Sequence, residues 1–329
     1  MYNNIKTIQT EKNASAFKET VDMNVGGQAV IEGVMMRSPK AIATAVRLPD
    51  GTIELKKKPF VSFVTRHKYL NIPVLRGTIN FLEMLFIGLD TLNWSADVQM
   101  RFENNKEGKI DSRGKRIRDI LLMGVTFFLA FVFAILIFFM LPIYVATLLG
   151  LTKGALLFNL IAGIIRLILF LSYILLISKM PDVKRIFRYH GAEHMSIFAL
   201  EASDTLSIES ARNKSRFHPR CGTSFILIVV LFSIFFLGLA DSLSPLIFGH
   251  MQSLLERFAT HLSLLPVVAG LSYEILKFSG KFRSNRLVKM LILPGLWLQK
   301  LTTAHPDDDM LEVAICALNA VLDTEEIKP

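Results

Sequence analysis

The sequence predicts a mainly α-helical, polytopic membrane protein with about four transmembrane helices, further amphipathic helices and a small N-terminal β-unit. The chain has 52% hydrophobic and only 20% charged residues, and its mean hydropathy is +0.44. Ordinary soluble domains carry about 25% charged residues, whereas about 20 consecutive apolar residues suffice to cross a bilayer. The net charge of +9 comes largely from Lys and Arg clusters that border the apolar runs. We therefore expect a lipid bilayer as partner and no nucleic acid.

The N-terminal part predicts β-structure. Residues 1–22 contain no apolar core, so we expect a flexible N-terminus without a cleavable signal peptide. Residues 26–37 are rich in Gly and β-forming residues, and Asp50-Gly51 separates two further β-forming runs at 42–48 and 52–55. Because Asp-Gly accepts the positive φ of a tight turn, these two runs predict a hairpin in a small antiparallel β-unit.

Two segments repeat apolar residues at helical spacing outside the long apolar runs. In residues 73–94 a charged side chain interrupts the apolar stripe about once every two turns. Spanning a bilayer would therefore be costly, and we expect this helix to lie on the membrane surface or on the spans. A second helix is expected over 310–322, because three consecutive aspartates precede it and favour a helix N-terminus.

Four apolar runs predict the membrane spans, at residues 120–149, 155–177, 223–239 and about 262–276. The first two are joined so closely that they predict an antiparallel hairpin. The third and fourth are short and polar-flanked, so a re-entrant or interfacial element stays open as an alternative. Residues 241–261 are expected to form the loop between them, and Pro266 can kink the fourth span.

The basic residues predict the orientation of these spans. Lys and Arg gather before the first span, after the second, before the third and after the fourth, within residues 113–118, 179–188, 212–220 and 277–289. All four flanks then fall on one side, which the positive-inside rule makes the cytoplasm. We expect a multi-pass protein of the bacterial inner membrane with both termini cytoplasmic. The two cysteines, Cys221 and Cys316, fit a reducing compartment.

Sequence order divides the chain into six expected segments: a flexible N-terminus (1–22), a cytoplasmic β-unit with an amphipathic helix (23–115), a transmembrane hairpin (116–178), a cytoplasmic His/Glu/Cys segment (179–221), a second transmembrane pair (222–278) and a cytoplasmic C-terminal segment (279–329).

The His/Glu/Cys segment contains the candidate metal site. His190 and His194 are four residues apart, so on a helix both imidazoles project from one face and can share a metal ion, with Glu193 beside them. This order, H-x-x-E-H, is the inverted form of a zinc-protease motif. His218 and Cys221 lie three residues apart just before the third span and are candidates to complete a zinc site.

Alternatives to a catalytic metal stay open at this segment. His190, Glu193 and His218 can instead form a hydrogen-bonded cap that holds the loop on the spans. In metal-free chemistry, the thiolate of Cys221 would be favoured by a helix N-terminus and by Arg220, with a histidine as base. Glu201 is two helical turns beyond His194 and on the same face, which makes it a further candidate.

Four charged residues elsewhere are also candidates. Arg166 falls near the middle of the second span, where it must face the bundle or a wet cavity or make an ion pair. Glu274 lies near the cytoplasmic end of the fourth span, and we expect it to approach the histidines as a ligand or proton acceptor. Glu32 and Arg37 in the Gly-rich segment either close over the site or make a local salt bridge.

The chain also resembles a known family at these residues. The resemblance covers about residues 23–322 and rests on Gly27-Gln28-Ala29-Val30, Glu32-Gly33-Val34-Met35-Met36-Arg37, Tyr189-His190-Gly191-Ala192-Glu193-His194, His218-Pro219-Arg220-Cys221 and Pro294-Gly295-Leu296-Trp297. In these motifs the chain is similar to the YqhQ-like bacterial membrane proteins of unknown function. The resemblance implies a predicted metal-dependent enzyme and supplies no substrate. The third ligand element of zinc peptidases is missing after the motif, which argues against peptidase chemistry.

Two functions follow as predictions. The first is a metal-dependent hydrolase at the cytoplasmic face, in which His190 and His194 bind zinc and either Glu193 or Glu274 accepts a proton. The second is a non-catalytic membrane scaffold or transport-associated protein whose polar or zinc cluster is structural. A catalytic site needs an open coordination position, whereas a structural zinc has four protein ligands.

Overall fold

A computed structural model describes residues 25–106, 113–151, 156–202, 204–250, 252–281 and 286–323. The segment 1–22, expected to be flexible, lies outside these ranges. The chain forms two compact units. The sheet unit comprises Met1–Val61, Arg185–His218 and Thr303–Pro329, and the helical unit comprises Ser62–Lys184 and Pro219–Thr302.

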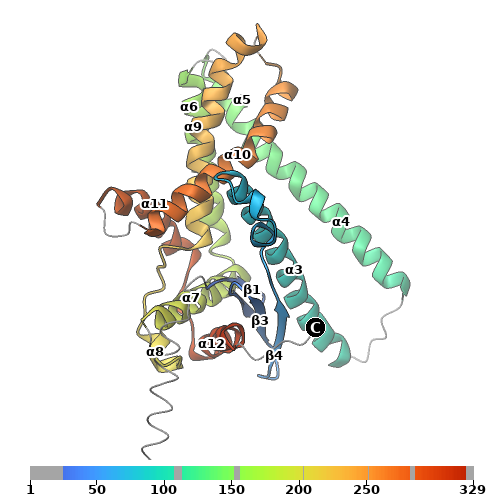
Figure 1. Ribbon diagram of the computed structural model, residues 1–329. Coiled ribbons are helices and arrows are strands. Elements are labelled where there is room, and N and C mark those ends of the chain that lie inside the picture. The colour runs from blue at the N-terminus through green and yellow to red at the C-terminus, as the bar shows by residue number, and fades with distance from the viewer. Residues whose placement is uncertain are drawn as a thin grey trace, which may run out of the picture. The chain divides into compact units, whose positions relative to one another are not determined.

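The sheet unit is built on a four-stranded antiparallel sheet in the order β1-β2-β3-β4 (Figure 1). Its strands are β1 (Gly26–Val30), β2 (Gly33–Arg37), β3 (Ala41–Arg47) and β4 (Ile53–Pro59). Arg47 pairs with Ile53 across the turn, where Gly51 has a φ of 88°. The hairpin predicted from Asp50-Gly51 is confirmed, and the Gly-rich segment before it adds a second hairpin to the same sheet.

Three helices complete the sheet unit: most of α7 (Pro181–Glu201), α8 (Ile208–Arg212) and α12 (Asp308–Leu322). Helix α12 packs on β2 and β3, and its apolar face is buried as its helical spacing predicts. The core of the unit consists of apolar side chains from the sheet, α7 and α12. They include Val34 and Met36 of the sheet, Tyr189 and Met195 of α7, and Leu311, Ala314 and Leu318 of α12.

The helical unit contains the apolar helices. They are α3 (Leu75–Lys106), α4 (Arg113–Ile135) with its continuation through η2 (Leu136–Met140) to α5 (Leu141–Leu148), α6 (Leu156–Ile177), α9 (Gly222–Phe248), α10 (Leu254–Lys281) and α11 (Arg286–Thr302), after the short α2 (Phe63–Arg66) and η1 (Lys68–Leu70). Helix α9 packs against α6, α10 and α11, and α3 packs along α10. Residues 73–94 were expected to lie on the membrane surface or on the spans, and α3 packs on α10, a candidate span.

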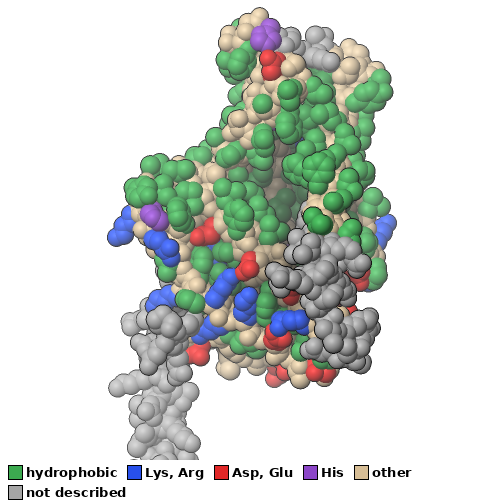
Figure 2. Space-filling model, turned by 90° about the vertical axis from the view of Figure 1, so that its right-hand side faces the viewer, with side chains coloured by type: hydrophobic (Ala, Val, Ile, Leu, Met, Phe, Trp, Pro, Cys, Tyr) green, Lys and Arg blue, Asp and Glu red, His purple; other side chains and the backbone are tan. Residues whose placement is uncertain are grey.

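Four helical stretches in the described residues are long and apolar enough to cross a membrane: Gly124–Leu148, Leu156–Ile177, Gly222–Phe248 and Leu254–Phe278. Figure 2 shows hydrophobic side chains over most of the visible surface of these helices. Leu129 and Phe133 on the first stretch and Leu246 on the third are among the exposed large apolar side chains. Such a surface is compatible with lipid contact and unusual for a soluble monomer.

The third and fourth candidate spans are longer than predicted. Residues 241–261 were expected to form a loop, but α9 continues to Phe248 and α10 begins at Leu254. That expectation is wrong because Asp241 is paired with Arg257 and His261. Polar side chains with such partners are tolerated inside buried helices, so a polar stretch in the sequence did not end the helix.

Candidate functional site

Helix α7 places the two motif histidines side by side in the sheet unit. The ring centroids of His190 and His194 are 4.4 Å apart. The side chain of His190 is 12% exposed, and that of His194 is 2% exposed. Their Nε2 atoms lie 3.8 Å and 3.6 Å from the same carboxylate oxygen of Glu193. The i, i+4 spacing therefore produces one compact cluster of two imidazoles and a carboxylate.

A backbone carbonyl orients His194. The Nδ1 atom of His194 lies 2.5 Å from the carbonyl oxygen of Arg216. A carbonyl can only accept a hydrogen bond, so Nδ1 carries the proton and Nε2 carries the lone pair of the neutral ring. Metal-binding histidines commonly use such a contact to fix the tautomer and the ring orientation.

Strand β1 supports Glu193. The carboxylate of Glu193 is buried and accepts a hydrogen bond from the backbone N–H of Gly27. Burial raises the pKa of Glu193 to about 7, although the nearby His190 and the Gly27 N–H favour the charged form. A carboxylate in this range can hold or release a proton near neutral pH.

His218 joins the cluster with an acidic partner. Its Nε2 atom lies 3.1 Å from Oε1 of Glu201, and its ring centroid is 5.7 Å from that of His194. The ring of Phe198 packs beside it at 4.5 Å. Glu201 thus reaches the cluster through His218, and the structure brings together five predicted residues: His190, Glu193, His194, Glu201 and His218.

The segment after residue 302 explains the glycine inside the motif. The backbone N–H of Ala304 donates to the carbonyl of Phe187 at 2.8 Å. A Cβ at Gly191 would lie 2.1 Å from the Ala304 carbonyl oxygen, so any side chain there would displace this segment. The guanidinium of Arg216 donates to the Thr303 carbonyl at 2.9 Å, which ties the segment to the residue whose carbonyl orients His194.

Glu32 and Arg37, expected to close over the site or to make a local salt bridge, contact other residues. Glu32, with a φ of 53°, forms an ion pair with Arg185 and accepts a hydrogen bond from the Tyr189 hydroxyl at 3.4 Å. Glu32 therefore anchors α7 next to the motif. The hydrogen bond that Arg185 donates to Glu32 raises the pKa of the Arg185 guanidinium. The guanidinium of Arg37 lies over the ring of Phe60, 4.4 Å from its centroid.

The remaining candidates belong to the helical unit. Cys221 is buried at the start of α9, where its Sγ accepts a hydrogen bond from the Thr223 N–H at 3.4 Å. Arg166 donates from Nε to the Phe138 carbonyl at 2.9 Å. Glu274 binds Arg76, whose Nε lies 2.7 Å from Oε1. The predicted approach of Glu274 to the histidines stays a prediction.

Two residues that contact the cluster could not be predicted from the sequence. Gly27 acts through its N–H and its missing side chain, and Arg216 acts through its carbonyl. Backbone groups leave no side-chain signature in a sequence. The Gly26-Gly27 pair was visible, but it predicted only a strand or turn.

Comparisons with known proteins identify a family and no function. No solved structure matches the chain. The chain is 34% identical to "Uncharacterized protein YqhQ" of Bacillus subtilis (strain 168) over 317 residues. This matched region covers 94% of this chain and 96% of that protein. A family described as "Protein of unknown function (DUF1385)" matches residues 72–324. The chain therefore belongs to the DUF1385 family.

Proposed function

We propose that this protein is a metal-dependent membrane hydrolase whose site is centred on α7. The observation that carries the proposal is the arrangement of Glu193, a buried carboxylate with a pKa of about 7, beside two adjacent imidazoles. A buried carboxylate with a pKa near neutral is the group expected of a general base.

His190 and His194 are the proposed metal ligands. The carbonyl of Arg216 directs the lone pair of His194 to Nε2, the atom nearer Glu193. Cys221 is the proposed third ligand, as the sequence spacing suggests. Cys221 follows His218 by three residues, so the chain limits their Cα separation to about 11 Å. Two imidazoles and a thiolate suit zinc.

The chain's own groups supply the acid–base step of this proposal. A bound zinc ion would supply a Lewis acid. Glu193 takes a proton from the water that attacks the substrate, and it later gives that proton to the leaving group when the scissile bond breaks. The Gly27 N–H holds the Glu193 carboxylate in place during both transfers. Glu201 positions His218, which is the alternative third ligand.

We further propose that the site works at the cytoplasmic face of the bacterial inner membrane. The support is the placement of the Lys and Arg clusters in the sequence. They precede the first and third spans and follow the second and fourth, and α7 begins directly after the second span, within one of these clusters. Both termini are then cytoplasmic.

A structural zinc or polar cluster in a non-catalytic scaffold is the second candidate. It is favoured by the burial of His194, which is 2% exposed, and of His218, whose side chain is 4% exposed and already paired with Glu201. In this version His190, His194, His218 and Cys221 would close the coordination sphere, with no position left for substrate.

The metal content of the purified protein tests the proposal. Wild-type protein in detergent should carry about one zinc ion, and His190→Ala or His194→Ala should remove most of it. His250→Ala is the matched control, because His250 is an exposed histidine of the helical unit, and it should leave the zinc content unchanged. Equal zinc in wild type and in the His190→Ala/His194→Ala double variant would eliminate the model.

Cobalt substitution separates the two candidates without a known substrate. An open site should bind an added hydroxamate, which would change the visible spectrum of the cobalt protein. A closed four-ligand site should show no change.

A further inference from the structure

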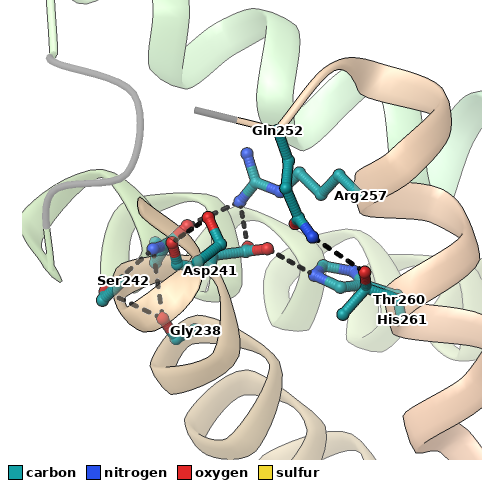
Figure 3. Close-up of polar contacts among 9 residues, drawn as sticks. Gly238, Asp241, Ser242, Gln252, Arg257, Thr260 and His261 are labelled. Carbon is teal, nitrogen blue, oxygen red and sulfur yellow. Dashed lines mark hydrogen bonds and ion pairs between the residues drawn. The ribbon is translucent and has the colours of Figure 1, made fainter. Parts of the chain in front are cut away.

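A second polar cluster lies among the apolar helices and uses no residue of α7 (Figure 3). Asp241 of α9 binds both Arg257 and His261 of α10, with 2.9 Å from His261 Nε2 to Asp241 Oδ1. Arg257 also donates to Asn159 Oδ1 of α6 at 2.5 Å. These four residues are between 5% and 9% exposed.

The cluster is enclosed by apolar rings. The guanidinium of Arg257 lies 5.3 Å from the centroid of the Phe158 ring, and the ring of Phe139 meets that of His261 edge-on at 5.5 Å. Burying charged groups among apolar helices is costly, and such residues most often serve a function. The ion pair with Asp241 offsets only part of this cost.

Three buried polar atoms in this cluster have no hydrogen-bond partner within the described part of the chain. They are Nε of Arg257, Nδ1 of His261 and Oε1 of Gln252. The amide nitrogen of Gln252 donates to the hydroxyl of Thr260, the residue before His261, at 2.9 Å. Buried groups of this kind are rare, because each loses its hydrogen bond to water.

The chemistry of these atoms defines what they can bind. The carboxylate of Asp241 lies against the guanidinium of Arg257 and accepts a hydrogen bond from His261 Nε2. In the neutral imidazole of His261, Nδ1 is then a lone pair that needs a donor, while Nε–H of Arg257 needs an acceptor. A carboxylate or phosphate dianion cannot donate, and an ammonium cannot accept. Arg166 adds a second positive charge that interacts with Arg257, which further disfavours a cation.

We propose that this cluster is a binding site for an uncharged hydroxyl group within the apolar helices. The hydroxyl donates to His261 Nδ1 and accepts from Arg257 Nε–H, and the Gln252 carbonyl takes a further donor of the same ligand. Water and the hydroxyl of a polyol share this chemistry, so the experiment includes both as probes.

The test uses full-length protein with ¹⁵N-labelled histidine in lipid bilayers at about pH 8, where an imidazole is ordinarily neutral. Solid-state NMR reports which ring nitrogen of each histidine carries the proton. His261→Gln assigns the signal by removing it, and His250→Gln, at the exposed histidine nearby, should leave it unchanged. His261 should show a protonated Nε2, an unprotonated Nδ1 and a cross-peak to ligand protons.

The ligand protons identify the source. A cross-peak to water alone shows a bound water, and one to added glycerol shows a site that accepts a polyol; both support the proposal. Arg257→Lys keeps a positive charge beside Asp241 but removes Nε–H, and it should abolish the cross-peak while His261 keeps its tautomer. A protonated Nδ1 in the wild type, or no cross-peak to either probe, would overturn the proposal without any need for a folded variant.

Discussion

Gly27 and Glu193 lie in direct contact, with the backbone N–H of Gly27 on the Glu193 carboxylate and no room for a side chain between them. A Cβ at residue 27 would be 2.7 Å from Glu193 Cγ and 2.7 Å from the Met35 carbonyl. Both distances are below any ordinary van der Waals contact. The first strand of the sheet therefore fixes the position of the proposed general base.

Gly27→Ala should lower the stability of the protein and displace Glu193. Overpacking of this kind costs about 1–3 kcal/mol. Gly26→Ala is a close control, because a Cβ at Gly26 meets nothing within 4 Å. Thermal unfolding in detergent should show a lower Tm for Gly27→Ala and an unchanged Tm for Gly26→Ala. Equal Tm values for the two variants would contradict the contact.

Glu193 should make the metal-free protein less stable as the pH rises. Its pKa is about 7 in the folded state and near 4.5 in the unfolded chain, so the folded state holds the proton more tightly. The stabilisation is complete below about pH 4.5 and is lost as the pH rises through 7, by an amount on the order of 3 kcal/mol.

Comparison with Glu193→Gln isolates this effect. After zinc removal, the Tm of the wild type should fall relative to the Tm of Glu193→Gln between about pH 5 and pH 8. Only the wild type must ionise a buried carboxyl over this range. A constant difference over this range would show that Glu193 is not the buried acid described above.

The thiolate of Cys221 should be visible in the cobalt-substituted protein. Thiolate ligands give near-ultraviolet charge-transfer absorption, which Cys221→Ser should abolish. Cys316→Ser is the matched control. Burial raises the pKa of Cys316, so its thiol stays protonated and does not compete for the metal. Absence of the band from the wild-type cobalt protein would leave His218 as the third protein ligand to test.

The sequence predicted the elements that depend on local periodicity and missed those that depend on distant partners. The hairpin at Asp50-Gly51 and the histidine pair on α7 follow from spacing alone. The ends of α9 and α10 do not, because helix can include Asp241 only when Arg257 and His261 neutralise it. The role of Gly27 is likewise invisible, since it depends on a strand meeting a helix more than 160 residues later.

The orientation in the membrane can be tested with reporter fusions. Fusions after Leu149 and after Gly249, between α9 and α10, should report the external side, and fusions after Lys184 and at the C-terminus the cytoplasm, because all basic flanks then face inward. An external signal after Lys184 would place α7 on the other side and refute a cytoplasmic site.

Glu274 should act in folding through Arg76, and a charge swap tests this. Arg76 binds both carboxylate oxygens of Glu274, and the two side chains are 20% and 22% exposed. Hydrogen bonds between charged groups contribute about 1.5–3 kcal/mol, so Arg76→Glu or Glu274→Arg alone should lower the Tm by placing like charges together. The double variant Arg76→Glu/Glu274→Arg restores an ion pair and should recover most of the loss.

A proton acceptor at residue 274 could not be replaced by arginine, so full zinc binding and full activity in the swapped protein would assign Glu274 to folding. Recovery of the Tm without recovery of activity would instead support the catalytic role predicted from its position near the end of the fourth span.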